Sequence, residues 1–287
     1  MALRFALVVT LVSFLAVPAG VAAADDAPPA SGPGQAPPKA PEKKDDAPKD
    51  GAKDGGAAKE PEAPAATLEQ VLADLADTKF VVKRLDAAAA AKTFQDPRLL
   101  PLLTKLLRDE SPDVRTAAIQ ALGARTEADH RKKAADSLAD RLKVLDGKPE
   151  AQEERIAVAG ALHDLAQPGA IGVLLDGIGT GTTLDEVDAR CRAVANVPSP
   201  KAIEELINLM AKRHRDGSGI RSSATKALQY ATGERSGNDP DQWRAWWKDH
   251  EKSFDFDAAA ERREKENAAK AERADRKEKG RGGKKKE

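Results

Sequence analysis

The sequence predicts an all-α fold, in which about five helix pairs stack into a right-handed solenoid that ends in a capping helix. Three observations support this fold class. A stripe of apolar residues at helical spacing recurs five times, and each stripe is followed at a similar distance by a pattern of small residues. The composition combines 33% charged residues with only 3% aromatic residues. Such a balance is typical of an alanine- and leucine-rich helical protein with polar flanking segments.

The first pattern consists of four apolar positions at i, i+3, i+4 and i+7, which lie on one face of a helix. Its five copies are Leu68/Val71/Leu72/Leu75, Leu99/Leu102/Leu103/Leu106, Ala135/Leu138/Ala139/Leu142, Ile171/Leu174/Leu175/Ile178 and Ile203/Leu206/Ile207/Met210. We expect each copy to be the buried face of the first helix of a pair.

The second pattern is a charged residue followed by small or apolar residues at +3, +6 and +7. Its copies are Arg84/Ala87/Ala90/Ala91, Arg115/Ala118/Ala121/Leu122, Arg155/Val158/Ala161/Leu162, Asp188/Cys191/Val194/Ala195 and Arg221/Ala224/Ala227/Leu228. The charged position follows the start of the first pattern by roughly 16 to 20 residues, which indicates two antiparallel helices joined by a turn. Because one pair cannot bury its apolar face alone, the pairs have to stack.

Prolines and glycines mark the expected helix ends. Pro97, Pro112 and Pro200 stand where the first turn of a helix tolerates proline. Gly123 and Gly233 stand where a helix would end in a left-handed residue.

The first 24 residues have the features of a secretory signal peptide. Arg4 precedes an apolar run from Phe5 to Val17, and Pro18 and small residues then lead to Ala24, after which we expect cleavage. The run is short for a membrane span. We therefore expect an exported protein, periplasmic or extracellular. The alternative is a signal that stays uncleaved and anchors the chain in the inner membrane.

The rest of the chain divides by composition. Residues 25–66 hold half of the 18 prolines and no large apolar residue, so we expect a disordered linker. We predict the repeat domain from residue 67 to 256. Residues 257–287 alternate in charge and end in lysines, which predicts a solvated charged helix followed by a basic disordered tail.

All three tryptophans lie just after the last repeat. Trp243, Trp246 and Trp247 share one face of a helix for which Pro240 is a suitable first residue. We expect this helix to cap the stack by covering the apolar surface of the final repeat. The alternative is an aromatic platform that binds sugars or peptides.

The sequence lacks the motifs of common catalytic and metal sites, and we expect no catalytic residue, cofactor or metal. It contains no HExxH, GxSxG, Walker-type phosphate loop or CxxC. Cys191 lies on an apolar stripe, which predicts a buried thiol, and His163 is expected at the boundary of the surface. Gly177, Gly179 and Gly181 are expected to form a flexible turn.

The segment from Ser111 to Gly123, SPDVRTAAIQALG, resembles the second helix of a HEAT repeat, in the short form found in bacterial HEAT-like (PBS-lyase-type) proteins. The resemblance covers residues 67–231. It implies an α-solenoid that scaffolds or binds partners, and it fixes no chemistry. It also implies that Asp113 and Arg115 bridge neighbouring repeats and are structural residues.

The C-terminal GxDPxxWxxWW ending is similar to one found in exported bacterial HEAT-like proteins. Together, these features predict a non-catalytic protein-protein interaction or scaffolding module of the bacterial cell envelope, a monomer whose protein partners are unidentified. One alternative is a bilin-lyase-like enzyme. Another is binding of nucleic acid or an acidic polymer through the lysine-rich tail. Basic and acidic residues number 47 each, so no global charge favours nucleic acid, and we expect no nucleic-acid partner.

Overall fold

The computed structural model describes residues 66–179, 181–212 and 217–282. The predicted signal peptide, the predicted linker up to residue 65 and the last five residues lie outside these ranges. All regular elements in the described residues are helices, so the predicted all-α fold class is confirmed there. None of the described helices is long and apolar enough to cross a membrane.

Five helix pairs follow one another along the chain. The first helices of the pairs are α1 (Leu68–Leu75), α3 (Leu99–Leu106), α5 (Ala128–Leu145), α7 (Ile171–Asp176) and α9 (Pro200–Ala211). The second helices are α2 (Val81–Ala90), α4 (Pro112–Gly123), α6 (Gln152–Leu165), α8 (Leu184–Ala195) and α10 (Gly217–Thr232). Two further helices, α11 (Pro240–His250) and α12 (Phe256–Gly282), complete the described chain. Short 3-10 helices lie at Ala91–Thr93, Pro149–Ala151, Pro168–Ala170 and Glu251–Ser253.

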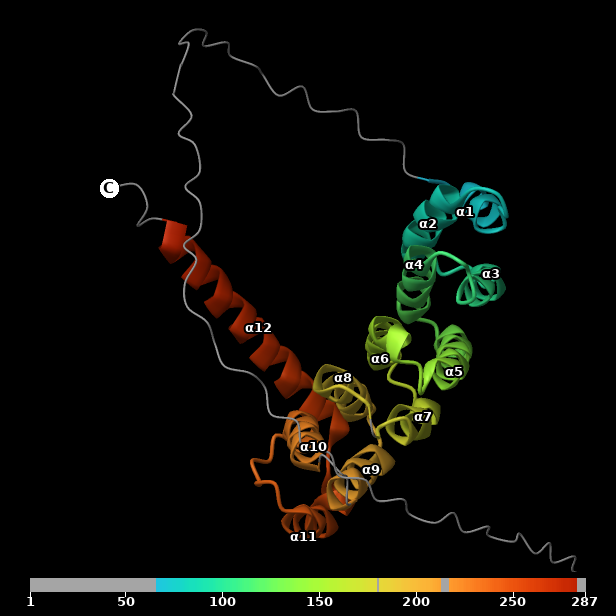
Figure 1. Cartoon of the computed structure of the whole chain (residues 1–287). Coiled ribbons are helices and arrows are strands. Elements are labelled where there is room, and N and C mark those ends of the chain that lie inside the picture. The colour runs from blue at the N-terminus through green and yellow to red at the C-terminus, as the bar shows by residue number, and fades with distance from the viewer. Residues whose placement is uncertain (1–65, 180, 213–216, 283–287) are drawn as a thin grey trace, which may run out of the picture. The chain divides into compact units, whose positions relative to one another are not determined.

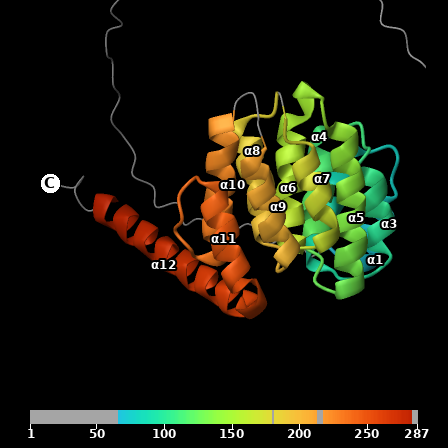
Figure 2. The ribbon, with the colours of Figure 1, turned by 90° about the horizontal axis from the view of Figure 1, so that it is seen from below.

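The pairs stack so that the helices form two rows (Figures 1 and 2). Each first helix contacts the first helix of the next pair, and each second helix contacts the next second helix. The same order continues after the fifth pair, since α11 packs against α9 and α12 packs against α10. The predicted stack of antiparallel pairs is therefore confirmed in the described residues.

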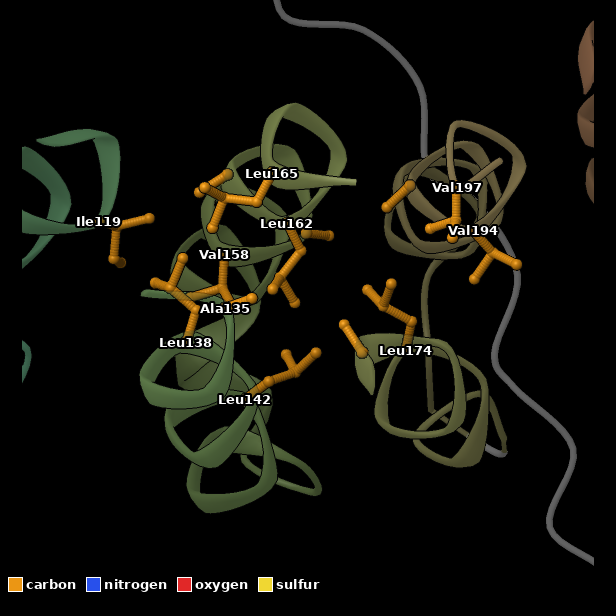
Figure 3. Close-up of a cluster of buried hydrophobic side chains, with 14 of the residues drawn as sticks. Ile119, Ala135, Leu138, Leu142, Val158, Leu162, Leu165, Leu174, Val194 and Val197 are labelled. Atoms are coloured by element: carbon orange, nitrogen blue, oxygen red, sulfur yellow. The ribbon is translucent and has the colours of Figure 1, made fainter. Parts of the chain in front are cut away.

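The core lies between the two rows and includes the apolar positions of the two predicted patterns. Every apolar position of both patterns is buried, except for four that are partly buried and pack against the core: Leu68, Leu72, Ala90 and Leu102. Figure 3 shows how this works in the middle of the stack, where Leu138 and Leu142 of α5 lie near Val158 and Leu162 of α6. Burying each leucine side chain contributes about 2 kcal/mol, so repetition of the stripe is what holds the pairs together.

Helix ends agree with the sequence at several positions. Ser111 and Thr183 accept hydrogen bonds from the backbone N–H groups of Val114 and Glu186, which fixes the starts of α4 and α8. Gly233 follows α10 with a φ of +77°, so its predicted left-handed conformation is confirmed.

The prediction for Gly123 is wrong, because this residue is the last of α4 and has no left-handed backbone. A Cβ atom at Gly123 would lie 3.0 Å from the Cβ of Ala161. Glycine is present here because α4 and α6 approach each other closely. A left-handed residue occurs elsewhere, at Ala166 after α6, with a φ of +49°.

The charged C-terminal helix is also docked at its start, which its charge pattern did not predict. Ala259 is buried, and Arg262 and Arg263 donate hydrogen bonds to the carbonyl oxygens of Thr232 and Ala231 at the end of α10 (3.0 and 3.2 Å). These carbonyls lack partners within their own helix, and cations near a helix C-terminus are favourable. Lys265 Nζ lies 3.8 Å from Glu261 Oε2 on the exposed side of this helix.

Candidate functional site

In the first three helix pairs, an arginine of the second helix forms an ion pair with a carboxylate of the following helix pair. Arg84 Nε lies 2.7 Å from Asp109 Oδ2, and Arg115 Nε lies 2.9 Å from Glu154 Oε2. Arg155 Nε lies 2.8 Å from Glu186 Oε1, with both side chains buried. We call this series the arginine ladder, consisting of Arg84–Asp109, Arg115–Glu154 and Arg155–Glu186. Because its members are shielded by the stack and paired with each other, they serve the fold.

Glu186 is the centre of the most buried part of the arginine ladder. Its carboxylate accepts from Arg155 and from Arg190, and Arg190 also pairs with Asp146. Burial by itself would raise the pKa of Glu186, but the hydrogen bond from Arg155 and the positive charges of Arg190 and Arg155 hold it below its usual value. Glu186 is therefore ionised in the folded protein at neutral pH.

Gly177 makes room for this cluster. Its φ is not left-handed, but a Cβ atom there would collide with the Arg190 guanidinium and the Asp146 carboxylate. The glycine-rich turn was expected to be flexible. At Gly177 the reason for glycine is instead the space that the buried ion pair needs.

The structure separates the two residues that the HEAT resemblance implied to be structural. Arg115 bridges to Glu154 and also donates to the carbonyl oxygens of Asp109 and Glu110. Asp113 is exposed in the first turn of α4, and it takes part in none of the ion pairs between described residues. The carboxylate that faces the second helix of the preceding pair belongs to Asp109, which precedes α4.

A hollow of about 720 Å³ opens beside the last second helices. We call it the α8–α10–α12 cleft. Its walls are Asp188 and Arg192 of α8, Lys226 and Tyr230 of α10, the following Gly233 and Arg235, and Arg262, Glu266, Asn267 and Lys270 of α12; His163, Ser223, Ala227 and Gln229 complete the lining. Figure 1 shows these three helices together at the end of the second row.

The cleft is basic, although the repeat domain is not. Five lining side chains are cationic, namely Arg192, Lys226, Arg235, Arg262 and Lys270, and two are carboxylates, Asp188 and Glu266. Residues 67–256 as a whole contain 28 basic and 30 acidic residues. The excess of positive charge is thus a local property of this surface, and it selects for anionic groups.

Arg262 joins α12 to the wall of the cleft. Its guanidinium lies against Gly233, where a Cβ atom would collide with it, and its Nη1 donates to the Thr232 carbonyl. Its Nη2 is buried and has no hydrogen-bond partner among the described residues. A buried charged donor without an acceptor is costly, so this atom favours an oxygen ligand nearby.

A second hollow of about 670 Å³ lies between the first two pairs, where the turns before α2 and α4 meet. Its cationic residues are Arg84, Lys105 and Arg108, and its carboxylates are Asp77, Asp109 and Glu110. Arg84 and Asp109 already neutralise each other. This hollow therefore has no preference for either sign of charge.

The residues with reactive side chains that the sequence singled out lie where it predicted. Cys191 is fully buried, and burial raises the pKa of its thiol to about 12, so the nucleophilic thiolate does not form near neutral pH. His163 is half-buried beside Asp164 and lies at the edge of the α8–α10–α12 cleft. No group of three or more potential metal ligands occurs among the described residues.

Sequence patterns did not reveal the cleft residues. Arg192, Arg235 and Lys270 come from α8, a loop and α12, and no motif or period links them. The patterns also missed Arg125, a buried side chain that donates to the carbonyl oxygens of Ala91 and Phe94 behind α2. A single charged residue in a sequence does not indicate which residues will surround it, whereas a repeated apolar stripe indicates which face of a helix is buried.

Residues 66–149 match the family model for HEAT repeats. The match covers the first two helix pairs and α5, and the later pairs repeat the same architecture. The described chain is therefore an all-α HEAT-like solenoid. No curated protein matches the chain.

Proposed function

We propose that this chain is a non-catalytic interaction or scaffolding module of the bacterial cell envelope, which binds protein partners through the surface of its second helices. HEAT repeats commonly mediate protein-protein interaction, and stacked helix pairs offer an extended surface for it.

The observation that carries the proposal is that some charged residues are paired inside the stack and others are exposed without a partner role in the fold. The charges of the arginine ladder are paired inside the stack. Four cations of the α8–α10–α12 cleft are exposed at the end of the second-helix row, where a partner can reach them: Arg192, Lys226, Arg235 and Lys270.

Export and capping belong to the same proposal. The signal-like residues 1–24 would direct the chain out of the cytoplasm, and the linker to residue 66 would separate the repeats from an uncleaved anchor if one remains. The tryptophan face of α11 would close the first-helix row by covering α9, which it contacts.

The test is chemical cross-linking in intact cells that express the full-length chain with a C-terminal affinity tag, followed by mass spectrometry of the purified adducts. We expect a small set of envelope proteins, with cross-links from lysines of the second-helix row such as Lys226. Adducts spread over all exposed lysines without a recurring partner would contradict the proposal. Mass spectrometry of the purified chain also reports the N-terminal residue, and an intact Met1 with a cytoplasmic distribution would contradict export.

A further inference from the structure

We infer that the α8–α10–α12 cleft binds an acidic segment of a partner protein, with aspartate and glutamate side chains as the recognised groups. This inference rests on the proposed function and specifies both the site and the chemistry of the partner.

Several cations of the cleft form no ion pair or hydrogen bond within the described fold. Arg192, Arg235 and Lys270 are exposed, and their side chains form no ion pair or hydrogen bond with any residue in the described ranges. Lys226 contacts Asp188 at 3.5 Å but keeps 66% of its side chain exposed. Elsewhere in the stack, the buried arginines each contact acceptors that fix them in place, as Arg155 and Arg190 do.

These cations are arranged around the cleft on several sides. They come from α8, α10, the loop after α10 and α12, so they surround a hollow. A row of charges along one exposed helix would be a solvated face. Cations on several sides of one cleft instead reinforce each other's potential at its centre, and they attract a ligand that carries several negative charges.

The side chains of the cleft favour carboxylates as the bound anions. Arginine guanidinium groups bind carboxylates through two parallel hydrogen bonds, and Arg192 and Arg235 are free to do so. Tyr230 and Asn267 add groups that can donate to a carboxylate or a peptide carbonyl. The volume of about 720 Å³ suits a short extended segment.

Nucleic acid fits the cleft less well. Its lining includes two rings that could stack on a base, Tyr230 and His163, and the Tyr230 ring already lies under Arg263, with 5.1 Å between the ring centre and the guanidinium carbon. Single-stranded nucleic acid is usually bound by several aromatic residues along a continuous basic groove. Asp188 and Glu266 would also repel a phosphate chain, whereas separate carboxylate side chains can avoid them.

The test measures fluorescence anisotropy of a labelled peptide in which Asp and Glu alternate with Ser and Gly. Two matched probes are the same peptide with Asn and Gln in place of the acids, and a single-stranded DNA oligonucleotide of equal charge. We expect the full-length chain to bind the acidic peptide and not its neutral counterpart. Affinity falls with rising salt, because the screening length shrinks to about 8 Å at physiological ionic strength.

Charge reversal identifies the site. In the double variant Arg192→Glu/Arg235→Glu, which removes no ion pair or hydrogen bond between described residues, we expect the affinity for the acidic peptide to fall by about tenfold or more. The control is Lys105→Glu/Arg108→Glu, which makes the same change of charge at the second hollow. We expect this control to bind as the unchanged chain does. Equal losses in both double variants, unchanged binding by the first, or tighter binding of the DNA would overturn the inference.

The outcome is distinguishable from that of the proposed function. If Arg192→Glu/Arg235→Glu keeps the cross-linked partners of the unchanged chain, the cleft inference fails and the interaction module stands. If the unchanged chain has no recurring partner in cells, the proposed function fails even when the peptide binds in vitro.

Discussion

Gly123 and Gly160 are both helical glycines, on the neighbouring helices α4 and α6, but they have different surroundings. A Cβ atom at Gly123 would lie 3.0 Å from the Ala161 Cβ, whereas a Cβ atom at Gly160 would have no neighbour within 4 Å. Glycine destabilises a helix relative to alanine, so only a packing requirement justifies it there. Gly123 meets that requirement, and Gly160 does not.

We therefore expect opposite effects from the same substitution. Gly160→Ala should raise the free energy of unfolding by about 1 kcal/mol, because alanine has the higher helix propensity. Gly123→Ala should lower it by about 1–3 kcal/mol, because the added methyl group overpacks the contact between α4 and α6. Urea unfolding of both variants measures this. A gain at both positions would show that the two helices do not approach so closely.

Ala166 has a left-handed backbone, with a φ of +49°. A non-glycine residue in this conformation is strained by about 1–2 kcal/mol, and glycine removes this strain. The greater freedom of glycine in the unfolded chain offsets part of that gain. Ala166→Gly should therefore stabilise the protein by up to about 1 kcal/mol, measured by calorimetry. A lower melting temperature would be incompatible with this account.

At the scale of helices, the arginine ladder decides how the pairs are held in register. Leucine stripes provide most of the burial, but apolar contacts are not directional. Arg155 and Glu186 interact in one geometry only, with two hydrogen bonds of 2.8 Å between α6 and α8. The pair thus fixes one helix against the next where the stripe alone would allow sliding.

Glu186→Gln should lower the free energy of unfolding by about 3 kcal/mol, since it leaves Arg155 and Arg190 buried without their shared counter-charge. The matched control is Asp113→Asn, at an exposed carboxylate outside the arginine ladder, where we expect a change within about 0.5 kcal/mol. Similar losses in both variants would contradict a specific role for the buried pair.

The same pair makes stability depend on acid pH. The pKa of Glu186 is lower in the folded protein than its ordinary value of 4.5, so its contribution is complete above that pH and disappears as the pH falls through the folded pKa. Asp109 has a lowered pKa too; burial opposes this shift, and Arg84 causes it. We expect the unchanged chain to lose stability below about pH 4.5 and Glu186→Gln to lose less. Parallel acid limbs for the two chains would exclude this contribution.

Substitution of the tryptophans of α11 tests whether this helix caps the stack. Trp243 is completely buried, donates from Nε1 to the Gly237 carbonyl at 2.8 Å, and belongs to the common core. Trp246 is only partly buried and stacks on His250 with 4.6 Å between the ring centres. Trp243→Ala should cost about 3–5 kcal/mol and lower the melting temperature clearly, whereas Trp246→Ala should cost much less. An unchanged melting curve for Trp243→Ala would reject the cap.

At the scale of the whole stack, each described pair is supported by its neighbours, and the pairs at the ends have fewer of them. Phe80 and Val82, at the start of α2, remain 57% and 69% exposed. The far part of α12 extends beyond its contacts with α10, since those contacts involve Arg262 and Arg263. Local stability should therefore fall from the middle pairs towards both ends.

Amide hydrogen exchange measures this gradient. We expect the slowest exchange in α4, α6 and α8, and faster exchange in α1 and in α12 beyond residue 270. Binding of an acidic peptide should slow exchange at the start of α12 and in α10, with little effect on α2 or α4. Uniform protection over all helices would show that the stack unfolds as one unit.

Periodicity determined the helix pairs, the buried faces, the burial of Cys191 and the existence of the α11 helix, because a repeated pattern states which face of each helix meets an apolar neighbour. The patterns could not predict which residues outside the repeated positions contact each other in the folded chain. The Arg155–Glu186 and Arg190–Asp146 pairs, the close approach at Gly123 and the docking of α12 all depend on contacts between residues that are about 30 or more positions apart.

The sequence by itself therefore determined a stack of helix pairs with polar flanks, since burial of apolar stripes is a local and repeated property. Only the tertiary structure decided which charged side chains are paired inside the stack and which are exposed to solvent. Arg155 and Arg192 are the same residue type, yet one is buried against Glu186 and the other lines the α8–α10–α12 cleft. That difference arises because the value of a charge depends on its burial and on its neighbours, and packing sets both.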